Sequence, residues 1–553
     1  MIFVSEFKGQ FNYITKIMEL KQSNNFLFRI NNLTCIILKK IIANTIISLI
    51  ILILFASCSS ANPIPSFEKG KILKEGDFVI KKGIYKNKIN AAYPKKINAD
   101  YMALAVKENR NKTDSKIITL PVIRLRSFSK QPKEPIFILN GGPGQSNILI
   151  NVWKKFPLLW LLDNHDIIMV GYRGVDSSVK LNSKAFGKAR ITQSNTLSRE
   201  HLNKLATVWK NELIRYKKEG IDINGYNIIE VIDDMELVKN KLGYDKINLL
   251  SVSYGTRIAY LYGIRHPKSI HKSIMGAANP PSKMVFNPDV TDKILEKYGV
   301  LWKQDSSNLK RSPDIIKTIQ HVFNTLPEKW RKIHLDPEKI RIMMFQILYS
   351  VKGAGKIFDG FIAAENGDHS GLALLIMMYD ANADKGEFTG DYIVKAVTAD
   401  YQPDKNYIDT MNSKNNLIGA PLSKQFAIAD LSGWKVPMIP EQYRKLSISH
   451  TPTLIFDGNL DVSTPVENAQ EMIKYLPNGK LVVMTDYGHL DLVSLFSYDP
   501  AISMMQEFYL TGSVLSKNLE HKPVKLDIPE RSPQKIGKLF YTLKRLGLLD
   551  IFL

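Results

Sequence analysis

Short runs of apolar residues, each ending near a glycine-rich turn, recur along this chain and limit the folds open to it. They lie at Ile136–Leu139, Ile167–Val170, Ile247–Val252, Thr453–Phe456 and Leu481–Met484. Strands that are apolar on both faces are typical of parallel sheets covered by helices on either side. Helical patterns separate most of these runs, so the sequence predicts an α/β fold. Earlier strands are expected at Tyr101–Val106 and Ile117–Leu125.

Between about Pro280 and Pro440 the short apolar runs are absent, and after this stretch they return. That stretch carries helical patterns at 340–351 and 371–379. We therefore expect a mostly parallel sheet with helices on both faces and a large, mainly helical lid inserted between its two halves. The expected parts are a leader (1–58), the first part of the core (59–280), the lid (281–440) and the second part of the core (441–553).

The composition is that of an ordinary folded protein, with 44% hydrophobic and 10% aromatic residues among 553. A formal net charge of +22 makes nucleic acid and anionic lipid partners to consider. The basic residues are spread along the chain, however, and no nucleic-acid-binding motif is present. We expect no nucleic-acid partner.

The N-terminal part reads as an export signal. An apolar run at Ile41–Phe55 follows Lys39-Lys40 and precedes Ala56-Ser57-Cys58. Residues 54–58 (LFASC) resemble a bacterial lipobox, which implies lipidation of Cys58, and the serine at position 59 implies the outer membrane. The alternative is an uncleaved anchor helix with a chance cysteine. In both cases we expect an exported protein, held in the bacterial cell envelope through an N-terminal lipid or anchor.

A strand, a turn of small residues and a helix meet at Ser253. The strand at Ile247–Val252 leads into Ser253-Tyr254-Gly255, and a helical pattern follows to His266. This is the arrangement of a nucleophile elbow, which exposes a serine hydroxyl at the edge of a sheet. Ser251 stands where the pattern usually has glycine, and an ordinary turn serine is the alternative interpretation.

The segment Asn140–Gly144 (NGGPG) directly follows another apolar run. Backbone N–H groups in such a loop can stabilise the negative charge that develops on a carbonyl oxygen during acyl transfer. We expect the N–H groups of Gly142 and Tyr254 to form this oxyanion hole. A glycine turn without a catalytic role is the alternative.

A carboxylate and a histidine follow two later apolar runs. Asp461 and His489 would both lie at the carboxyl edge of the sheet, where such folds build their sites. The chain order serine, aspartate, histidine is that of a nucleophile, an orienting acid and a general base. Asp457 and Asp486 are rival candidates for the acid.

Together these motifs resemble the prolyl aminopeptidase and tripeptidyl aminopeptidase family of α/β-hydrolase serine peptidases. The motifs are GGPG (141–144), GYRG (171–174), VIDDMELV (231–238), SYGTRIAYLYGIRHP (253–267), the Gly458 to Pro465 loop and Gly488-His489. Asn140, Gly171 and Ser251 depart from the family pattern. The resemblance implies cleavage of an amide bond near a free N-terminus, with release of proline or a short peptide.

The resemblance also implies that the lid supplies an acidic group for the substrate ammonium. Asp400 and Glu365 are the substrate-binding candidates, with Asp368 a further possibility. An esterase or lipase with the same three residues is the first alternative function. An inactive binding protein is the second, and it predicts a missing catalytic residue, whereas all three are present. No metal or cofactor is expected, because no HExxH motif or cysteine cluster occurs.

Overall fold

The computed structural model describes residues 64–87, 91–148, 157–192, 195–384, 389–411, 416–514, 519, 526, 529 and 532–545. All described residues belong to one unit of the chain, Ile64–Leu553. The expected export signal and Cys58 therefore lie outside the described residues. Within the described part, no helix combines the length and apolar character needed to cross a membrane.

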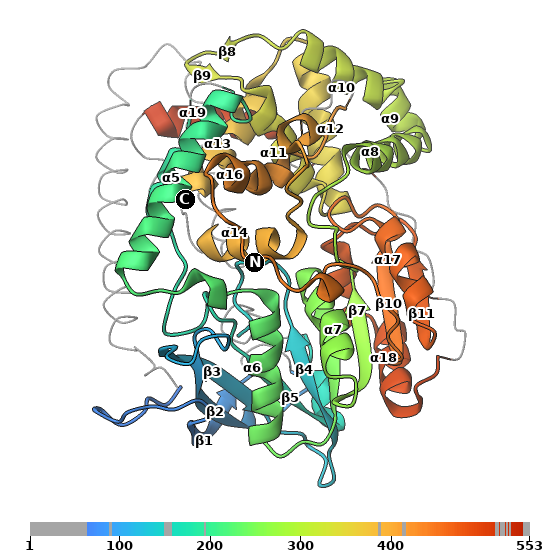
Figure 1. The fold of residues 1–553 in the computed structure, drawn as a ribbon. Coiled ribbons are helices and arrows are strands. Elements are labelled where there is room, and N and C mark those ends of the chain that lie inside the picture. Colours follow the sequence, from blue (N-terminus) through green and yellow to red (C-terminus); the bar gives the residue numbers. More distant parts are fainter. Residues whose placement is uncertain are drawn as a thin grey trace, which may run out of the picture. The chain divides into compact units, whose positions relative to one another are not determined.

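A nine-stranded sheet forms the base of this unit, in the order β1-β2-β3-β5-β4-β6-β7-β10-β11 (Figure 1). The strands are β1 (Phe78–Lys86), β2 (Lys96–Lys107), β3 (Ile117–Leu125), β4 (Lys133–Leu139), β5 (His165–Val170), β6 (Ile247–Val252), β7 (Ile270–Gly276), β10 (Thr453–Gly458) and β11 (Gly479–Met484). Neighbours from β1 to β5 pair antiparallel, and the strands from β5 to β11 pair parallel. The carboxyl ends of the parallel strands therefore meet at one edge.

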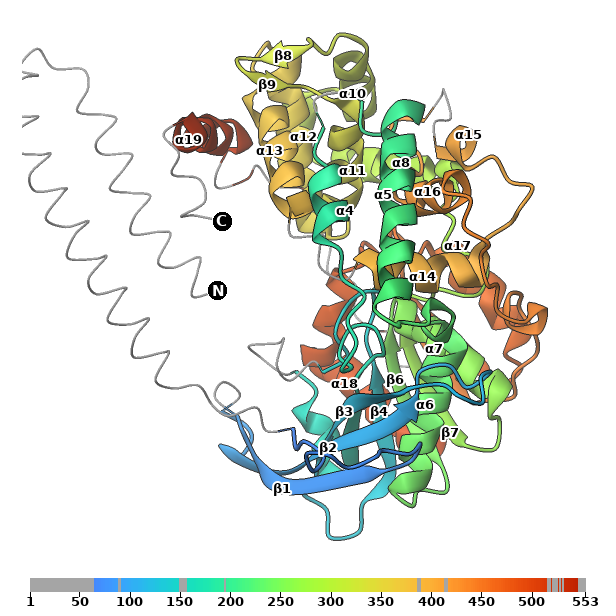
Figure 2. The ribbon, with the colours of Figure 1, turned by 60° about the vertical axis from the view of Figure 1, so that its left-hand side comes forward.

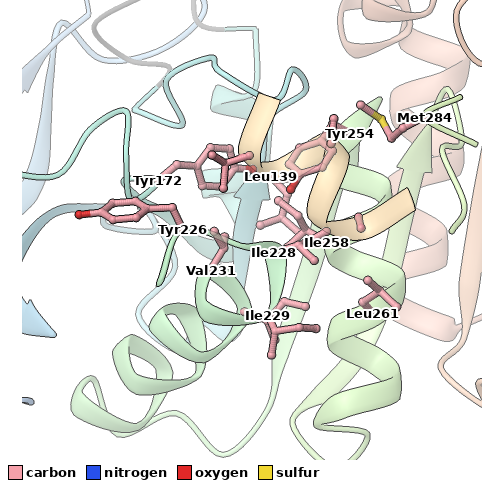
Figure 3. Packing of buried hydrophobic residues seen from close by; sticks show 14 of the residues in the cluster. Leu139, Tyr172, Tyr226, Ile228, Ile229, Val231, Tyr254, Ile258, Leu261 and Met284 are labelled. Atoms are coloured by element: carbon pink, nitrogen blue, oxygen red, sulfur yellow. The ribbon is translucent and has the colours of Figure 1, made fainter. Parts of the chain in front are cut away.

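Helices cover both faces of this sheet because its strands are apolar on both sides. The helices outside the insertion are α4 (Lys184–Ala189), α5 (Arg199–Lys218), α6 (Ile228–Lys241), α7 (Tyr254–Arg265), α17 (Val466–Met472), α18 (Asp499–Thr511) and α19 (Pro533–Arg545). Of these, α5 and α19 also pack against helices of the insertion. In β4, Phe137 and Leu139 join a buried cluster with α6 and α7, whereas Ile136 and Ile138 join a separate cluster with α18. Figure 3 shows the first cluster, with Leu139 among the side chains of α6 and α7. The expected α/β class is confirmed.

Two strands of the sheet escaped the sequence prediction. The outer strand β1 (FVIKKGIYK) carries no fully buried residue, because it pairs with β2 alone at the sheet edge. Strand β7 (IHKSIMG) lies between β6 and β10, but its polar start hides the apolar pattern. The amine of Lys272 within it donates a hydrogen bond to the Tyr509 carbonyl oxygen (2.8 Å), which permits its burial.

Along the chain, a helical insertion lies between β7 and β10, as expected. Its helices are α8 (Pro288–Lys303), α9 (Ser306–Arg311), α10 (Ile315–Asn324), α11 (Pro337–Ile347), α12 (Val351–Glu365), α13 (Ser370–Asp384), α14 (Thr389–Asp400), α15 (Tyr407–Met411) and α16 (Lys424–Leu431), with the short hairpin β8 (Lys329–Trp330) and β9 (Ile333–His334). Figure 2 shows its helices α10 to α13 together, apart from strands β1 to β3. The helix expected over 340–351 is interrupted, since α11 ends at Ile347 and α12 begins at Val351. The insertion has a hydrophobic core of its own around Trp302 and Phe358.

Candidate active site

Ser253 occupies the sharp turn between β6 and α7. Its φ of 54° lies in a region that non-glycine residues rarely adopt, and it ends the strand so abruptly that α7 starts at the next residue. Two glycines make the turn possible. A Cβ on Gly255 would lie 2.2 Å from the carbonyl oxygen of Leu139, and one on Gly141 would lie 2.9 Å from the Ser253 Cβ. Ser251, in place of the usual glycine, donates its hydroxyl to the Ile274 carbonyl oxygen (3.1 Å).

The glycine-rich loop after β4 lies against Ser253. Gly142 has a φ of 119°, which favours glycine, and it lines the same cavity as Ser253. Tyr254 is the first residue of α7, and a helix leaves its first N–H groups without intrahelical acceptors. The loop is tied down at its base by Asn147, whose amide nitrogen donates to the carbonyl oxygens of Ile138 (3.0 Å) and Val170 (2.8 Å).

The structure brings Ser253, His489 and Asp461 together from the ends of three strands. His489 Nε2 lies 3.1 Å from Ser253 Oγ, and His489 Nδ1 lies 2.7 Å from Asp461 Oδ2. The imidazole side chain is 9% exposed and the Asp461 carboxylate is fully buried. Because Nδ1 faces a carboxylate, the tautomer with its proton on Nδ1 is favoured, which leaves Nε2 free to accept the serine proton.

Backbone and hydroxyl donors hold the Asp461 carboxylate in place. Oδ1 accepts hydrogen bonds from the N–H groups of Ser463 (2.7 Å) and Thr464 (2.8 Å), and Oδ2 accepts one from Thr464 Oγ1 (2.7 Å). Thr464 Oγ1 also lies 3.1 Å from His489 Nδ1. The sequence motif from Gly458 to Pro465 contained this threonine, but sequence reasoning gave it no role.

The two rival acids have other roles. The Asp457 carboxylate accepts hydrogen bonds from the N–H groups of Ala278 (2.9 Å) and Gly458 (2.9 Å), which bridges β10 and the end of β7. Burial, and then the nearby charge of Asp461, raise the pKa of Asp457. Asp486 has a φ of 58° and donates its backbone N–H to Asn459 Oδ1 (2.7 Å), so it shapes the turn before His489.

The junction of α11 and α12 in the insertion contacts the loop from Gly488 to Asp491, called the histidine loop because it carries His489. The Tyr349 ring packs against the His489 ring with centroids 5.0 Å apart. Asp491 joins the two segments, because its carboxylate accepts hydrogen bonds from Ser350 Oγ (2.8 Å), the Val351 N–H (2.8 Å) and the Gly488 N–H (3.0 Å). Burial raises the pKa of Tyr349 to about 12, so its hydroxyl stays protonated beside the histidine at neutral pH.

A cavity of about 1070 Å³ opens at Ser253 and His489, between the sheet edge and the insertion. Apolar side chains such as Met284, Phe286 and Phe496 form much of its wall. Among the described residues that line it, Arg190 and Lys424 are cationic and none is a carboxylate.

The structure does not bring Asp400 or Glu365 to this cavity. Asp400 is buried, forms an ion pair with Arg257 (2.8 Å) and accepts the N–H groups of Ser282 (3.0 Å) and Met284 (2.7 Å). Its charge is therefore neutralised by Arg257, and its hydrogen bonds fix the start of the insertion. Glu365 accepts a hydrogen bond from Thr318 Oγ1 (3.0 Å), which joins α12 to α10. Asp368, the third acid considered, pairs with Lys538 of α19 (2.8 Å).

Asp391 of α14 is a buried lid carboxylate that sequence reasoning missed. Its Oδ2 accepts the Gly144 N–H (3.1 Å), and its Oδ1 pairs with Lys395 Nζ (2.6 Å). Lys395 also donates to the Arg173 carbonyl oxygen (2.9 Å). The Asp391–Lys395 spacing of four residues marks a helical ion pair, but only the fold places that pair against the glycine-rich loop. Within the described part of the chain, no group of three or more His, Cys, Asp or Glu side chains is placed to hold a metal ion.

Comparisons with known proteins agree with this architecture. A family model described as "alpha/beta hydrolase fold" matches residues 134–334, and one described as "TAP-like protein" matches residues 420–519. The two matches cover the glycine-rich loop and Ser253, and then Asp461 and His489.

Two curated relatives align with about a third of their own length. The putative hydrolase YuaR of Escherichia coli (strain K12) is 28% identical over 186 residues, which are 32% of this chain and 34% of that protein. The serine protease Hip1 of Mycobacterium tuberculosis (strain ATCC 25618 / H37Rv) is 28% identical over 192 residues, 32% of this chain and 36% of that protein. The solved structure of a proline iminopeptidase from Mycobacterium smegmatis is 12% identical, with 71% of this chain and 95% of that chain aligned, at a TM-score of 0.35. That score is too low to support an inference.

Proposed function

We propose that this chain, which has the α/β-hydrolase fold and matches the TAP-like family model over residues 420–519, is a serine peptidase that acts through an acyl-enzyme on Ser253. The observation that carries the proposal is the hydrogen-bonded series from Ser253 Oγ to His489 to the buried Asp461. A nucleophile, a base and a group that orients the base are the three parts of this chemistry.

In the proposed reaction His489 Nε2 takes the proton of Ser253 as its Oγ attacks the substrate carbonyl. The N–H groups of Gly142 and Tyr254 donate to the oxygen that becomes negative, and each such donor is worth roughly 10²–10³-fold in rate. The imidazolium, stabilised by Asp461, then gives its proton to the leaving amine. Water, deprotonated by the same histidine, hydrolyses the acyl-enzyme and restores the serine.

Peptide substrates are supported by the TAP-like match and by the similarity to a protein named as a serine protease. Release of residues from a free N-terminus is the narrower form of this proposal. It needs a negative group for the substrate ammonium, and the described lining of the cavity offers none. That same apolar lining supports a second candidate function, an esterase with the same three residues.

Hydrolysis of matched substrates separates these functions. Full-length protein in detergent is tested on Ala- and Pro-aminomethylcoumarin amides, on a tripeptide amide, on their N-acetylated counterparts and on 4-nitrophenyl butyrate. A peptidase hydrolyses the amides, and a strict aminopeptidase rejects the acetylated ones. Turnover of the butyrate alone identifies an esterase. Ser253→Ala should abolish every activity, and substantial residual turnover would show that another residue is the nucleophile.

We further propose that the protein is exported and held at the cell envelope by a lipid on Cys58. The support is the sequence, in which an apolar run and small residues precede the cysteine. Cells fed radiolabelled palmitate should label the wild-type chain and not the Cys58→Ser variant. Equal labelling of both would exclude this cysteine, and membrane association without labelling would favour an anchor helix.

A further inference from the structure

One wall of the active-site cavity carries two positive side chains from segments far apart in the sequence. Arg190 follows α4, and Lys424 is the first residue of α16. Both line the cavity that holds Ser253, and the charge of Arg190 acts on Lys424. Both side chains are half-buried, and placing two cations beside each other with little access to water is unfavourable unless an anion joins them.

The hydrogen bonds of the two cations do not involve all of their N–H groups. Arg190 donates from Nη2 to the carbonyl oxygens of Asn382 (3.2 Å) and Ala383 (3.1 Å), but its buried Nε has no hydrogen-bond partner. Lys424 Nζ reaches the Tyr379 hydroxyl at 3.3 Å, a neutral and long contact, and lies 5.4 Å from the centre of that ring. Neither contact supplies a negative charge.

Two described carboxylates near these cations have other hydrogen-bonding or ion-pair partners, although the charge of Asp336 still acts on Lys424. Asp380 pairs with Lys339 of α11 (2.7 Å), and Asp336 accepts the N–H groups of Thr196 (2.9 Å) and Glu338 (2.9 Å). Burial, followed by the charge of Arg190, lowers the pKa of Lys424 to about 7. An anion bound at this wall would restore the full charge of that lysine.

The backbone adds to the positive potential at the same place. Lys424 begins α16, so the partial positive charge of the helix N-terminus coincides with the lysine. Ser423, which could cap these N–H groups, instead accepts the backbone N–H of Phe286 (3.0 Å) with its hydroxyl, and no side-chain cap is formed. A lysine in the first turn opposes the helix dipole, which is unfavourable without a bound anion.

We propose that this wall binds a carboxylate carried by the substrate, so that the enzyme prefers anionic substrates to neutral or amine-bearing ones. The inference rests on the proposed function, because the cations line the cavity of the proposed nucleophile. It names a substrate class opposite in charge to the ammonium expected from the family resemblance. A carboxylate on the acyl part and one on the leaving group have the same chemistry, and the experiment separates them.

Binding is measured first, by titration calorimetry on full-length Ser253→Ala protein, so that the result does not depend on turnover. The acyl-side probes are mono-4-nitrophenyl glutarate and its methyl ester, and the leaving-group probes are 4-carboxyphenyl and 4-carbamoylphenyl butyrate. We expect the acid of one pair to bind about 10–100-fold more tightly than its neutral partner, as for hydrogen bonds to a charged group. The same preference should appear in kcat/KM of the wild-type protein.

Variants of the lysine test the assignment. Lys424→Met should reduce the preference for the acid about tenfold, Lys424→Arg should retain it, and Lys424→Glu should shift it toward 4-nitrophenyl 5-aminopentanoate. Lys210→Met, on the exposed side of α5, is the control because it changes the net charge equally. Thermal unfolding of each variant verifies folding.

Equal binding of the acid and the neutral probe in both pairs would overturn the inference. It would also be overturned if Lys424→Met and Lys210→Met changed the preference for the acid by the same factor. Failure of the proposed function looks different. In that case the wild-type protein turns over none of the esters, or Ser253→Ala remains active, while the calorimetric preference for the acid persists.

Discussion

At the scale of single residues, the site depends on close backbone contact more than on large side chains. Gly141 allows the glycine-rich loop to contact Ser253, and Gly255 allows α7 to start close to the end of β4. The strained φ of Ser253 is tolerated because β6, α7 and the loop fix the turn from three sides.

Gly141→Ala should therefore reduce kcat/KM by about 100-fold, since a displacement of about 1 Å at a reacting group can have that effect. The new Cβ would lie 2.9 Å from the Ser253 Cβ, so either the loop or the nucleophile must move. Steady-state kinetics on 4-nitrophenyl butyrate provide the measurement. Gly360→Ala in α12, where a Cβ meets no atom within 4 Å, is the matched control and should raise the midpoint of thermal unfolding slightly. Equal kinetics for both variants would contradict this account.

The ion pair of Asp233 should make the free energy of unfolding depend on pH. Burial alone would raise the pKa of Asp233, but hydrogen bonds from His266 (3.2 Å) and Arg265 (2.6 and 2.8 Å) outweigh it and lower the pKa to about 2. A lowered pKa contributes stability above the ordinary value of 3.8, and that contribution disappears as the pH falls through about 2. Asp233→Asn should lower the free energy of unfolding by about 2 kcal/mol at pH 7 and by much less near pH 2. Urea unfolding at the two pH values checks this, and a loss independent of pH would refute it.

At the scale of elements, two helices of the insertion hold loops of the active site. The carboxylate of Asp391 in α14 accepts a hydrogen bond from the glycine-rich loop, and the start of α12 is joined to the histidine loop through Asp491. The insertion is thus part of the catalytic geometry as well as a cover for the cavity.

Asp391→Asn should lower kcat about tenfold with a smaller effect on KM, because the loop loses its charged acceptor while the cavity keeps its lining. It also leaves the buried Lys395 without its partner, at a cost of about 3–5 kcal/mol in stability. The double variant Asp391→Asn with Lys395→Met should recover much of that stability and keep the kcat defect. Recovery of kcat together with stability would show that Asp391 acts only on folding.

At the scale of the whole unit, the core of the insertion reaches the acid of the site. Leu460 and Val462, on either side of Asp461, belong to the hydrophobic cluster around Trp302 and Phe358. Sheet and insertion have separate cores, so a loosened insertion should displace Asp461 before the sheet unfolds.

Trp302→Ala tests this coupling. The side chain is fully buried, packs edge-on against Phe358 and donates its Nε1–H to the Ser312 carbonyl oxygen (2.9 Å). We expect a loss of about 3–5 kcal/mol and a midpoint of thermal inactivation that falls below the midpoint for loss of strand signal in circular dichroism. Coincident midpoints would mean that the two cores unfold as one.

The sequence was informative where position follows from topology. The strand predicted at Ile247–Val252 has the bounds of β6, and Ser253, Asp461 and His489 each follow an apolar run. Parallel strands bring such positions to one edge, so the structure places these three side chains in contact. This holds however many residues separate the strands along the chain.

The sequence was uninformative where position follows from packing between distant segments. Arg190 follows a helix outside the insertion and Lys424 begins one inside it, so the two line one cavity only in the folded chain. Asp400 matched the expected acidic lid position, yet the buried Arg257 occupies its carboxylate. A charge on a helix gives no sign of whether solvent, substrate or an internal partner will meet it.

Along the chain the insertion lies between Ser253, the proposed nucleophile, and His489, the proposed base, so the two residues are synthesised at different times. Ser253 and His489 are separated by 236 positions, so at about 5–20 residues per second the ribosome needs roughly 10–50 s to add the base after the nucleophile. During that interval the serine has neither its proton acceptor nor Asp461, and a chain cut off within the insertion lacks both permanently. On the proposed mechanism, a partly synthesised chain is therefore inactive because these residues are missing, and no inhibitory segment has to be removed later.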